Sequence, residues 1–188
     1  MIRRSILSLV VLLLGILPIA AQEQTFSAVS PSGHTLYYLT NGLEATLIAQ
    51  NGGFTNSYDN LSGRVVVPSK VLFGSDSLTV TRVSGLTFAG CQSLVSVVFP
   101  PTLTAMQSNC FYNCHALQSI HIGAAVDSIE ELAINSCSNI DTITVDTANT
   151  RYDSRYNCNA VIRTADSTLL LGCRRTVIPS TVDRKSVV

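Results

Sequence analysis

This 188-residue sequence contains six cysteines, whose thiols can take part in more kinds of chemistry than its other side chains. A thiol can form a disulfide, bind a metal ion or act as a nucleophile, and its spacing and surroundings decide between these roles. Cys91, Cys114 and Cys137 recur at a constant 23-residue spacing, and the sequence contains no C-x-x-C pair. We therefore expect these three thiols to pack as small apolar side chains, and the sequence predicts no metal site and no cofactor.

The other three cysteines, Cys110, Cys158 and Cys173, lie outside that spacing. Cys110 is expected to be a free thiol. Apolar runs at 160–162 and 169–171 flank a polar turn, which predicts a β-hairpin. Symmetric pairing about the turn places Cys158 opposite Cys173, so these two are the most favourable pair for a disulfide.

The histidines, His34, His115 and His121, do not suggest catalysis. None stands at a telling distance from a nucleophile or a carboxylate, and the sequence has neither a G-x-S-x-G motif nor a glycine-rich phosphate loop. The adjacent carboxylates Glu130 and Glu131 are typical of a solvated face. The sequence therefore predicts no catalytic residue and no enzyme.

The regularly spaced cysteines belong to an internal repeat over residues 80–145. A period in the twenties is typical of a leucine-rich-repeat solenoid, so we expect a mainly β fold whose 23-residue coils stack about 4.8 Å apart. Each coil would hold a short strand, a turn, a second extended piece and a compact turn. Shifting the stretch by one period aligns seven apolar columns: Val80/Leu103/Val126, Val83/Met106/Ile129, Phe88/Phe111/Ile134, Cys91/Cys114/Cys137, Leu94/Leu117/Ile140, Val97/Ile120/Ile143 and Phe99/Ile122/Val145.

Alternation along the first strand of each coil directs a second set of side chains away from the core. Solenoids commonly bind extended partners on such strand faces, so these residues are the best candidate binding surface. The alternative is a sheet face that is only solvated. The residues form two columns, Ser96, Ser119 and Thr142 in one and Val98, His121 and Thr144 in the other.

Two segments flank the repeat. Residues 22–79 are predicted to form an N-terminal β cap, with a hairpin turn at 74–77 and strands at 25–29, 35–39 and 45–49. Residues 146–182 are predicted to contain an irregular segment, the hairpin described above and, at 176–179, the start of a further repeat.

Charge and the N-terminus indicate where the protein works. Twelve basic residues balance twelve acidic ones, which argues against a nucleic-acid partner and against docking on anionic lipid. Residues 1–21 are predicted to be a signal peptide, with Arg3 and Arg4 before an apolar run and small residues at the cleavage point. The run is shorter than the ~20 apolar residues that span a bilayer, so we expect export without membrane insertion after cleavage.

The repeat residues resemble a known family. The pattern at 88–94 and 97–100, with Gly-Cys, Leu and a strand ending in Pro, is similar to BspA-type leucine-rich repeats, and so are 26–38 and 152–162. The resemblance implies a right-handed leucine-rich-repeat solenoid in a secreted or cell-surface protein of anaerobic Gram-negative, Bacteroidales-like bacteria. Members of the family are described as adhesins, which implies an unidentified protein or glycan partner on a host or bacterial surface.

A modification is also suggested by resemblance. Asp followed by Ser or Thr and then an apolar residue or Thr is similar to the O-glycosylation acceptor motif of related bacteria. The alternative is chance occurrence in a chain rich in these residues. The acceptors would be Ser77, Ser128, Thr142, Thr147 and Ser167.

Three functions remain open. The first is an exported, non-catalytic recognition module, adhesin-like, that binds host proteins, glycans or other cell surfaces through the strand face. The second is a structural scaffold or spacer within a larger, truncated surface protein. A minor alternative is an accessory domain of an enzyme.

The last six residues, 183–188, are expected to be an artefact. Lys185 stands where the repeat requires the inward apolar side chain supplied by Met106 and Ile129. The same six residues and a stop codon are encoded by GATCGGAAGAGCGTCGTGTAG, a common sequencing-adapter sequence. We therefore predict that the natural protein continues beyond Val182.

Overall fold

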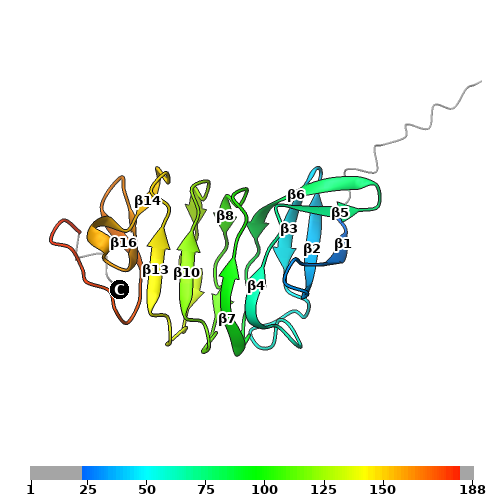
Figure 1. Ribbon diagram of the computed structural model, residues 1–188, viewed down its shortest axis with the longest axis horizontal. Coiled ribbons are helices and arrows are strands. Elements are labelled where there is room, and N and C mark those ends of the chain that lie inside the picture. The colour runs from blue at the N-terminus through cyan, green and yellow to red at the C-terminus, as the bar shows by residue number, and fades with distance from the viewer. Residues whose placement is uncertain (1–22, 183–188) are drawn as a thin grey trace, which may run out of the picture.

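The computed structural model describes residues 23–182, which form an elongated stack of coils flanked by an N-terminal cap and a C-terminal sheet (Figure 1). The predicted signal peptide at 1–21 and the predicted artefactual tail at 183–188 lie outside the described residues. Apart from one 3₁₀ turn at Arg155–Asn157, the regular elements of the described part are β-strands. The predicted mainly β class is confirmed.

Three ladders of parallel strands run along the stack and give each coil three sides. The first is a four-stranded sheet in the order β13-β10-β7-β4. The second joins β6, β8 and β11, and the third pairs β9 with β12. The strands are β4 (Ser62–Val66), β6 (Asp76–Val83), β7 (Ser93–Val98), β8 (Ala105–Met106), β9 (Phe111–Tyr112), β10 (Ser119–Ile122), β11 (Ser128–Ile129), β12 (Ile134–Asn135) and β13 (Thr142–Val145).

The register of these ladders confirms the 23-residue period. Met106 pairs with Ile129, Phe111 with Ile134, and Ile120 with Ile143, and in each pair the partner lies one period further along the chain. Three independent ladders with one offset mean that each coil repeats the path of the previous coil. The chain over 80–145 is therefore a leucine-rich-repeat solenoid, as the period predicts.

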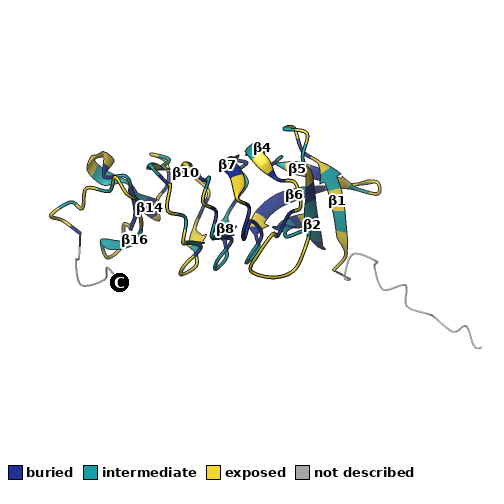
Figure 2. Cartoon of the chain, turned by 90° about the horizontal axis from the view of Figure 1, so that it is seen from below, coloured by how far each residue is buried: buried dark blue, intermediate teal, exposed yellow. Residues whose placement is uncertain are grey.

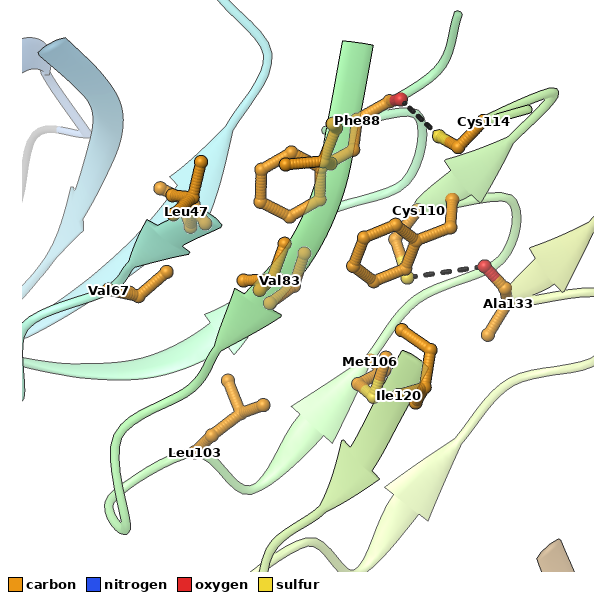
Figure 3. Close-up of a cluster of buried hydrophobic side chains, with 14 of the residues drawn as sticks. Leu47, Val67, Val83, Phe88, Leu103, Met106, Cys110, Cys114, Ile120 and Ala133 are labelled. Carbon is orange, nitrogen blue, oxygen red and sulfur yellow. Dashed lines mark hydrogen bonds between the residues drawn. The ribbon is translucent and has the colours of Figure 1, made fainter. Parts of the chain in front are cut away.

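The apolar columns fill the interior of the coils (Figure 2). Figure 3 shows Val83, Met106 and Ile120 from three different strands and Phe88 from the turn after β6, all within the same interior. The rings of Phe88 and Phe111 are stacked with their centroids 4.8 Å apart, which equals the spacing of paired strands. Like residues thus stack on like residues through the core.

The N-terminal cap continues one of the repeat sheets. Strands β1 (Thr25–Val29), β2 (Thr35–Asn41) and β3 (Glu44–Ile48) form an antiparallel meander, and β3 then pairs in parallel with β6. Strand β5 (Lys70–Phe73) forms a hairpin with β6. Because β6 also pairs with β8, this one strand runs across the predicted boundary between cap and repeat.

The C-terminal segment forms a separate antiparallel sheet from β14 (Tyr152–Asp153), β15 (Ala160–Arg163) and β16 (Thr168–Gly172). The predicted hairpin is present, but a register shift follows Val161, which pairs with Leu171. Cys158 and Cys173 are free thiols in the structure, which therefore does not contain the disulfide for which they were the most favourable pair. The shift breaks the symmetric pairing on which that prediction depended, and Cys158 ends the 3₁₀ turn instead of lying in β15.

Two positions in each coil take the left-handed backbone conformation. They are Leu86, Asn109 and Leu132 at one repeat position, and Gly90, Asn113 and Ser136 at the other. These residues turn the chain around the corner that carries β9 and β12. Gly90 has a further constraint, because a Cβ there would lie 2.5 Å from the backbone nitrogen of Asn56 in the loop that covers it.

Candidate functional site

The candidate site is the outer face of the four-stranded sheet, here called the strand face. All six sequence-predicted residues lie on it, two each from β7, β10 and β13. In register, Ser96 and Ser119 pair with one another, Ser119 pairs with Thr142, and His121 pairs with Thr144. The first predicted column therefore runs in register across all three strands and the second across β10 and β13, and the sheet is visible as the row of broad arrows in Figure 1.

Strand alternation explains why these residues face outward. Ile120 and Ile143 point into the core and are almost fully buried, whereas His121, Thr142 and Thr144 are exposed. Ser96 and Ser119 are half-buried in the middle of the face. Val98 is 37% exposed and is the one apolar member of the two predicted columns. The face offers hydroxyls, an imidazole and a small apolar patch.

One hydrogen bond links the polar side chains across neighbouring strands. His121 Nδ1 lies 2.9 Å from Thr144 Oγ1, which holds the imidazole over the sheet. A second pair with the same 23-residue spacing, His115 and Ser138, makes a 3.3 Å contact in the compact turn. Stacked polar residues thus order one another as the apolar columns do, and a partner would meet a preorganised surface.

Strand β4 extends the strand face by one strand that the sequence interpretation omitted. Arg64 pairs with Ser96, and Val66 pairs with Val98, so both columns gain a member. The signal was present, because residues 65–68 carry the strand-plus-Pro pattern of the repeat. The β5–β6 hairpin is an insertion that lengthens the offset from Val65 to Val97 beyond one period, so β4 lies outside the 23-residue columns that defined the predicted face.

At the other end, two arginines lie beside Asp141, the residue immediately before β13. Arg174 forms an ion pair of 2.8 Å with Asp141, and Arg175 approaches the same carboxylate at 3.7 Å. Both guanidinium groups are largely exposed, so each pair contributes little to stability. They place positive charge at this corner of the face, as Arg64 does on β4.

The cysteine column packs in the core, as predicted, and all six thiols are free. Burial raises the pKa of the Cys91 thiol to about 12. The Cys114 thiol contacts the Phe88 carbonyl at 2.9 Å, and Cys110 contacts the Ala133 carbonyl at 3.3 Å (Figure 3). These thiols are held protonated and shielded, which is the environment of inert cysteines.

Cys137, in the last coil, differs from its buried neighbours. It is half-buried, and a hydrogen bond with the Cys114 thiol lowers the pKa of Cys137 and raises that of Cys114.

Among residues 23–182, no cluster of three or more His, Cys, Asp or Glu side chains could hold a metal ion. In the same range, no helix has the length and apolar character needed to cross a membrane.

One serine–histidine contact resembles a catalytic pair but has a structural explanation. Ser32 Oγ lies 3.0 Å from His34 Nδ1, and it also accepts a hydrogen bond from the Val66 N–H. Ser30 bonds both Ser32 and the His34 backbone. These contacts close the turn between β1 and β2 and anchor it to β4, so the hydroxyl is occupied by the fold.

The predicted glycosylation acceptors differ in exposure. Ser77, Ser128, Thr142 and Thr147 are exposed, whereas Ser167 is half-buried and accepts a hydrogen bond from Arg155. Thr142 lies on the strand face, so a glycan there would cover part of that surface. The modification itself remains a prediction.

Comparison with known families supports the repeat geometry. Residues 75–167 match the model of the BspA type Leucine rich repeat region in six copies. These residues form a BspA-type leucine-rich-repeat region. The match begins in the β5–β6 hairpin and ends in the β15–β16 turn, so it covers both the coils and part of the C-terminal sheet.

Two solved structures are similar to this chain at low identity. A leucine-rich cell surface protein from Faecalibacterium prausnitzii A2-165 has a TM-score of 0.38 at 14% identity, covering 77% of this chain and 61% of its own. The pneumococcal vaccine antigen PcpA has a TM-score of 0.32 at 9% identity, covering 85% of this chain and 60% of its own. The chain thus spans about three fifths of the solved chains it matches. No curated protein matches the sequence.

Proposed function

We propose that this BspA-type repeat protein is an exported, non-catalytic recognition module that binds a host protein, a glycan or another cell surface through its strand face. The observation that supports the proposal is that the two faces of one sheet differ in character. Inward positions of β7, β10 and β13 form the core, whereas the outward positions form two columns of exposed or half-buried side chains, all polar except Val98. Secretion or surface display is part of the proposal and rests on the predicted signal peptide.

The strand face suits an extended partner because its features repeat at a constant interval. Four strands spaced about 4.8 Å apart make the face about 14 Å wide across β4 to β13. Arg64 at one end and Arg174 and Arg175 at the other bracket the hydroxyl and imidazole columns. A partner with hydrogen-bonding groups along its length would meet a donor or an acceptor on every strand.

A binding screen with face variants tests the proposal. The protein would be immobilised and exposed to a panel of matrix proteins, mucins and purified glycans. For any ligand found, the double substitution His121→Ala with Thr144→Ala should weaken binding by at least tenfold, because it removes the hydrogen-bonded pair at the centre of the face.

Matched control substitutions lie on another side of the same coils. Asp127 and Ser128 are exposed beside β11, so Asp127→Ala with Ser128→Ala removes two polar groups without touching the strand face. Unchanged binding in this control, with loss in the face variant, supports the proposal. Unchanged binding by both variants would exclude the strand face as the site.

A further inference from the structure

Strand β13 has an open edge on the side away from β10. In a parallel ladder, alternate residues turn both backbone groups to the same neighbour. The N–H groups of Thr142 and Asp146 donate to Gln118 and Ile122 in the β10 coil. Ile143 and Val145 alternate with these residues and therefore direct their N–H and C=O groups to the other side, where the described residues supply no further strand.

The side chain of Asn159 covers one half of this edge. Its Oδ1 accepts a hydrogen bond of 2.9 Å from the Ile143 N–H, and its Nδ2 donates one of 2.9 Å to the Asp141 carbonyl. A carboxamide carries a donor and an acceptor in one plane, as a peptide group does. Asn159 thus imitates a single peptide unit of the strand that would follow β13.

The other half of the edge faces a cleft. Within residues 23–182, the Ile143 carbonyl and both backbone groups of Val145 have no protein hydrogen-bond partner. They open onto a cavity of about 390 Å³ between β13 and the C-terminal segment. One wall is formed by residues 143–147, and the facing wall by Tyr152, Asp153, Ser154 and Arg155.

We propose that this cleft binds an extended polypeptide segment of another protein as an added strand on β13. The chemistry that fits is a backbone whose donors and acceptors recur at every second residue, about 6.6 Å apart, and an extended polypeptide supplies that pattern. The site adjoins the strand face at Thr144 but uses the backbone edge of β13, so it goes beyond the proposed function.

The walls of the cleft are mostly polar, and Asp146 is their one charged side chain without an ion-pair partner among the described residues. The Arg155 guanidinium is neutralised by Asp153, with nitrogen–oxygen distances of 2.8 and 2.7 Å, and a third bond to Ser167 fixes its position. The wall therefore presents no free charge from this pair. Tyr152, Ser154 and Asn157 add polar groups, whereas Ile143 and Val145 turn their side chains to the core.

Amide hydrogen exchange followed by NMR tests the proposal directly. The probe is a capped synthetic peptide with the sequence of residues 118–123, because this strand already pairs with the other edge of β13. In the free protein, the Val145 amide should exchange faster than that of Ile143. Peptide at ten times its dissociation constant should slow Val145 exchange about tenfold and leave the β1 edge unchanged.

Two variants locate the effect. Asn159→Ala should speed Ile143 exchange in the free protein and let the peptide protect Ile143 as well as Val145. Thr147→Trp should fill the cleft and abolish the protection, whereas Ala148→Trp, at the next exposed position outside the cleft lining, should keep it. Protection of the Phe111 amide, which bonds Ala133 within the core coils, reports in each variant that the stack is intact.

Three results would overturn the proposal. They are a Val145 amide already protected in the free protein, no slowing with peptide at about 1 mM, and equal slowing at β1, which would indicate non-specific strand pairing. Loss of protection in both tryptophan variants would also place the peptide somewhere other than the cleft.

Discussion

The two ends of the solenoid are closed in different ways. At the N-terminal end, β3 hydrogen-bonds to β6 and so extends a repeat sheet into the cap. At the C-terminal end, β14 to β16 form a sheet of their own that meets the last coil through side chains. The first closure uses the backbone ladder, and the second uses contacts such as those of Asn159 with β13.

The apolar columns are buried more completely at the N-terminal end of the solenoid than at the C-terminal end. Val83 and Phe88 in the first coil are 0% exposed, whereas their counterparts Ile129 and Ile134 in the third coil are only half-buried. A ladder brings the next layer to about 4.8 Å along its whole length, and a separate sheet touches only where its own shape permits. The last coil is therefore the least sealed part of the repeat, and it carries the free edge of β13.

The largest expected effect on stability comes from alanine substitutions at two residues of one column, one fully buried and one half-buried. Phe111→Ala should lower the free energy of unfolding by about 3–5 kcal/mol, because it leaves a cavity between Phe88 and the next coil. Ile134→Ala, at the same repeat position, should cost only about 2 kcal/mol because that side chain is half-buried. Urea unfolding measures both, and equal losses would contradict the difference between the two ends.

Gly90 tests the close contact at the capped end. Gly90→Ala should destabilise the protein by about 2–3 kcal/mol, because its Cβ would collide with the backbone of Thr55 and Asn56. Gly123→Ala is the matched control, since a Cβ there has no neighbour within 4 Å. Thermal unfolding of the two variants should separate them clearly, and similar melting temperatures would show that the 51–58 loop does not press on Gly90.

Leu132 tests backbone strain in the less sealed coil. Its φ is 56° and its side chain is 62% exposed, whereas Asn109 takes the same conformation one coil earlier. Leu132→Asn should raise the free energy of unfolding by about 1 kcal/mol, because Asn tolerates the left-handed region better than Leu. Chemical denaturation would measure the gain. A loss of stability would mean that the Leu132 side chain makes contacts that matter more than the strain.

The smallest expected effect concerns the ion pair in the C-terminal segment. The Arg155 guanidinium lowers the pKa of Asp153 below its usual value. The stabilisation is therefore present above the unfolded-state pKa of about 3.9 and is lost as the pH falls through the lower folded-state value. Asp153→Asn should cost about 1 kcal/mol or less at pH 7, and the gap to the natural protein should narrow as the pH falls below the unfolded-state pKa.

Melting temperatures of the two proteins between pH 7 and pH 3 would follow that narrowing of the gap. Asp59→Asn is a suitable comparison, because Asp59 accepts hydrogen bonds from Gln50 and Asn51 in an exposed loop and pairs with no cation among the described residues. A constant gap for Asp153→Asn across this pH range would contradict the role assigned to the ion pair.

Most of the repeat could be predicted from the sequence because its signal is periodic. Each column of apolar residues marks one inward-facing position of the repeat, and the same position recurs in three coils. Met106 and Ile143 could therefore be assigned to the core without knowledge of any contact. The six strand-face residues followed from the same alternation. The prediction weakened at β4, where an inserted hairpin disrupts the count, and at β15, where one register shift separates Cys158 from Cys173.

Other features have no period in the sequence. The left-handed positions of the repeat hold Leu, Asn, Gly and Ser, so residue type alone does not reveal that they share one conformation. Arg174 and Arg175 lie beside Asp141 only because the C-terminal segment folds back on the last coil. Asn159 likewise meets β13 across a stretch of irregular chain.

By itself, the sequence determined the 23-residue coil, the inward and outward columns and the packing role of the stacked cysteines, because side-chain alternation and stacking depend on local spacing. The tertiary structure alone decided how the stack is closed. Closure depends on which backbone N–H and C=O groups have no hydrogen-bond partner in a neighbouring coil, and these groups can be identified only once the coils are assembled. On the outer edge of β13, Asn159 bonds one part of these groups, and the other part faces a cleft.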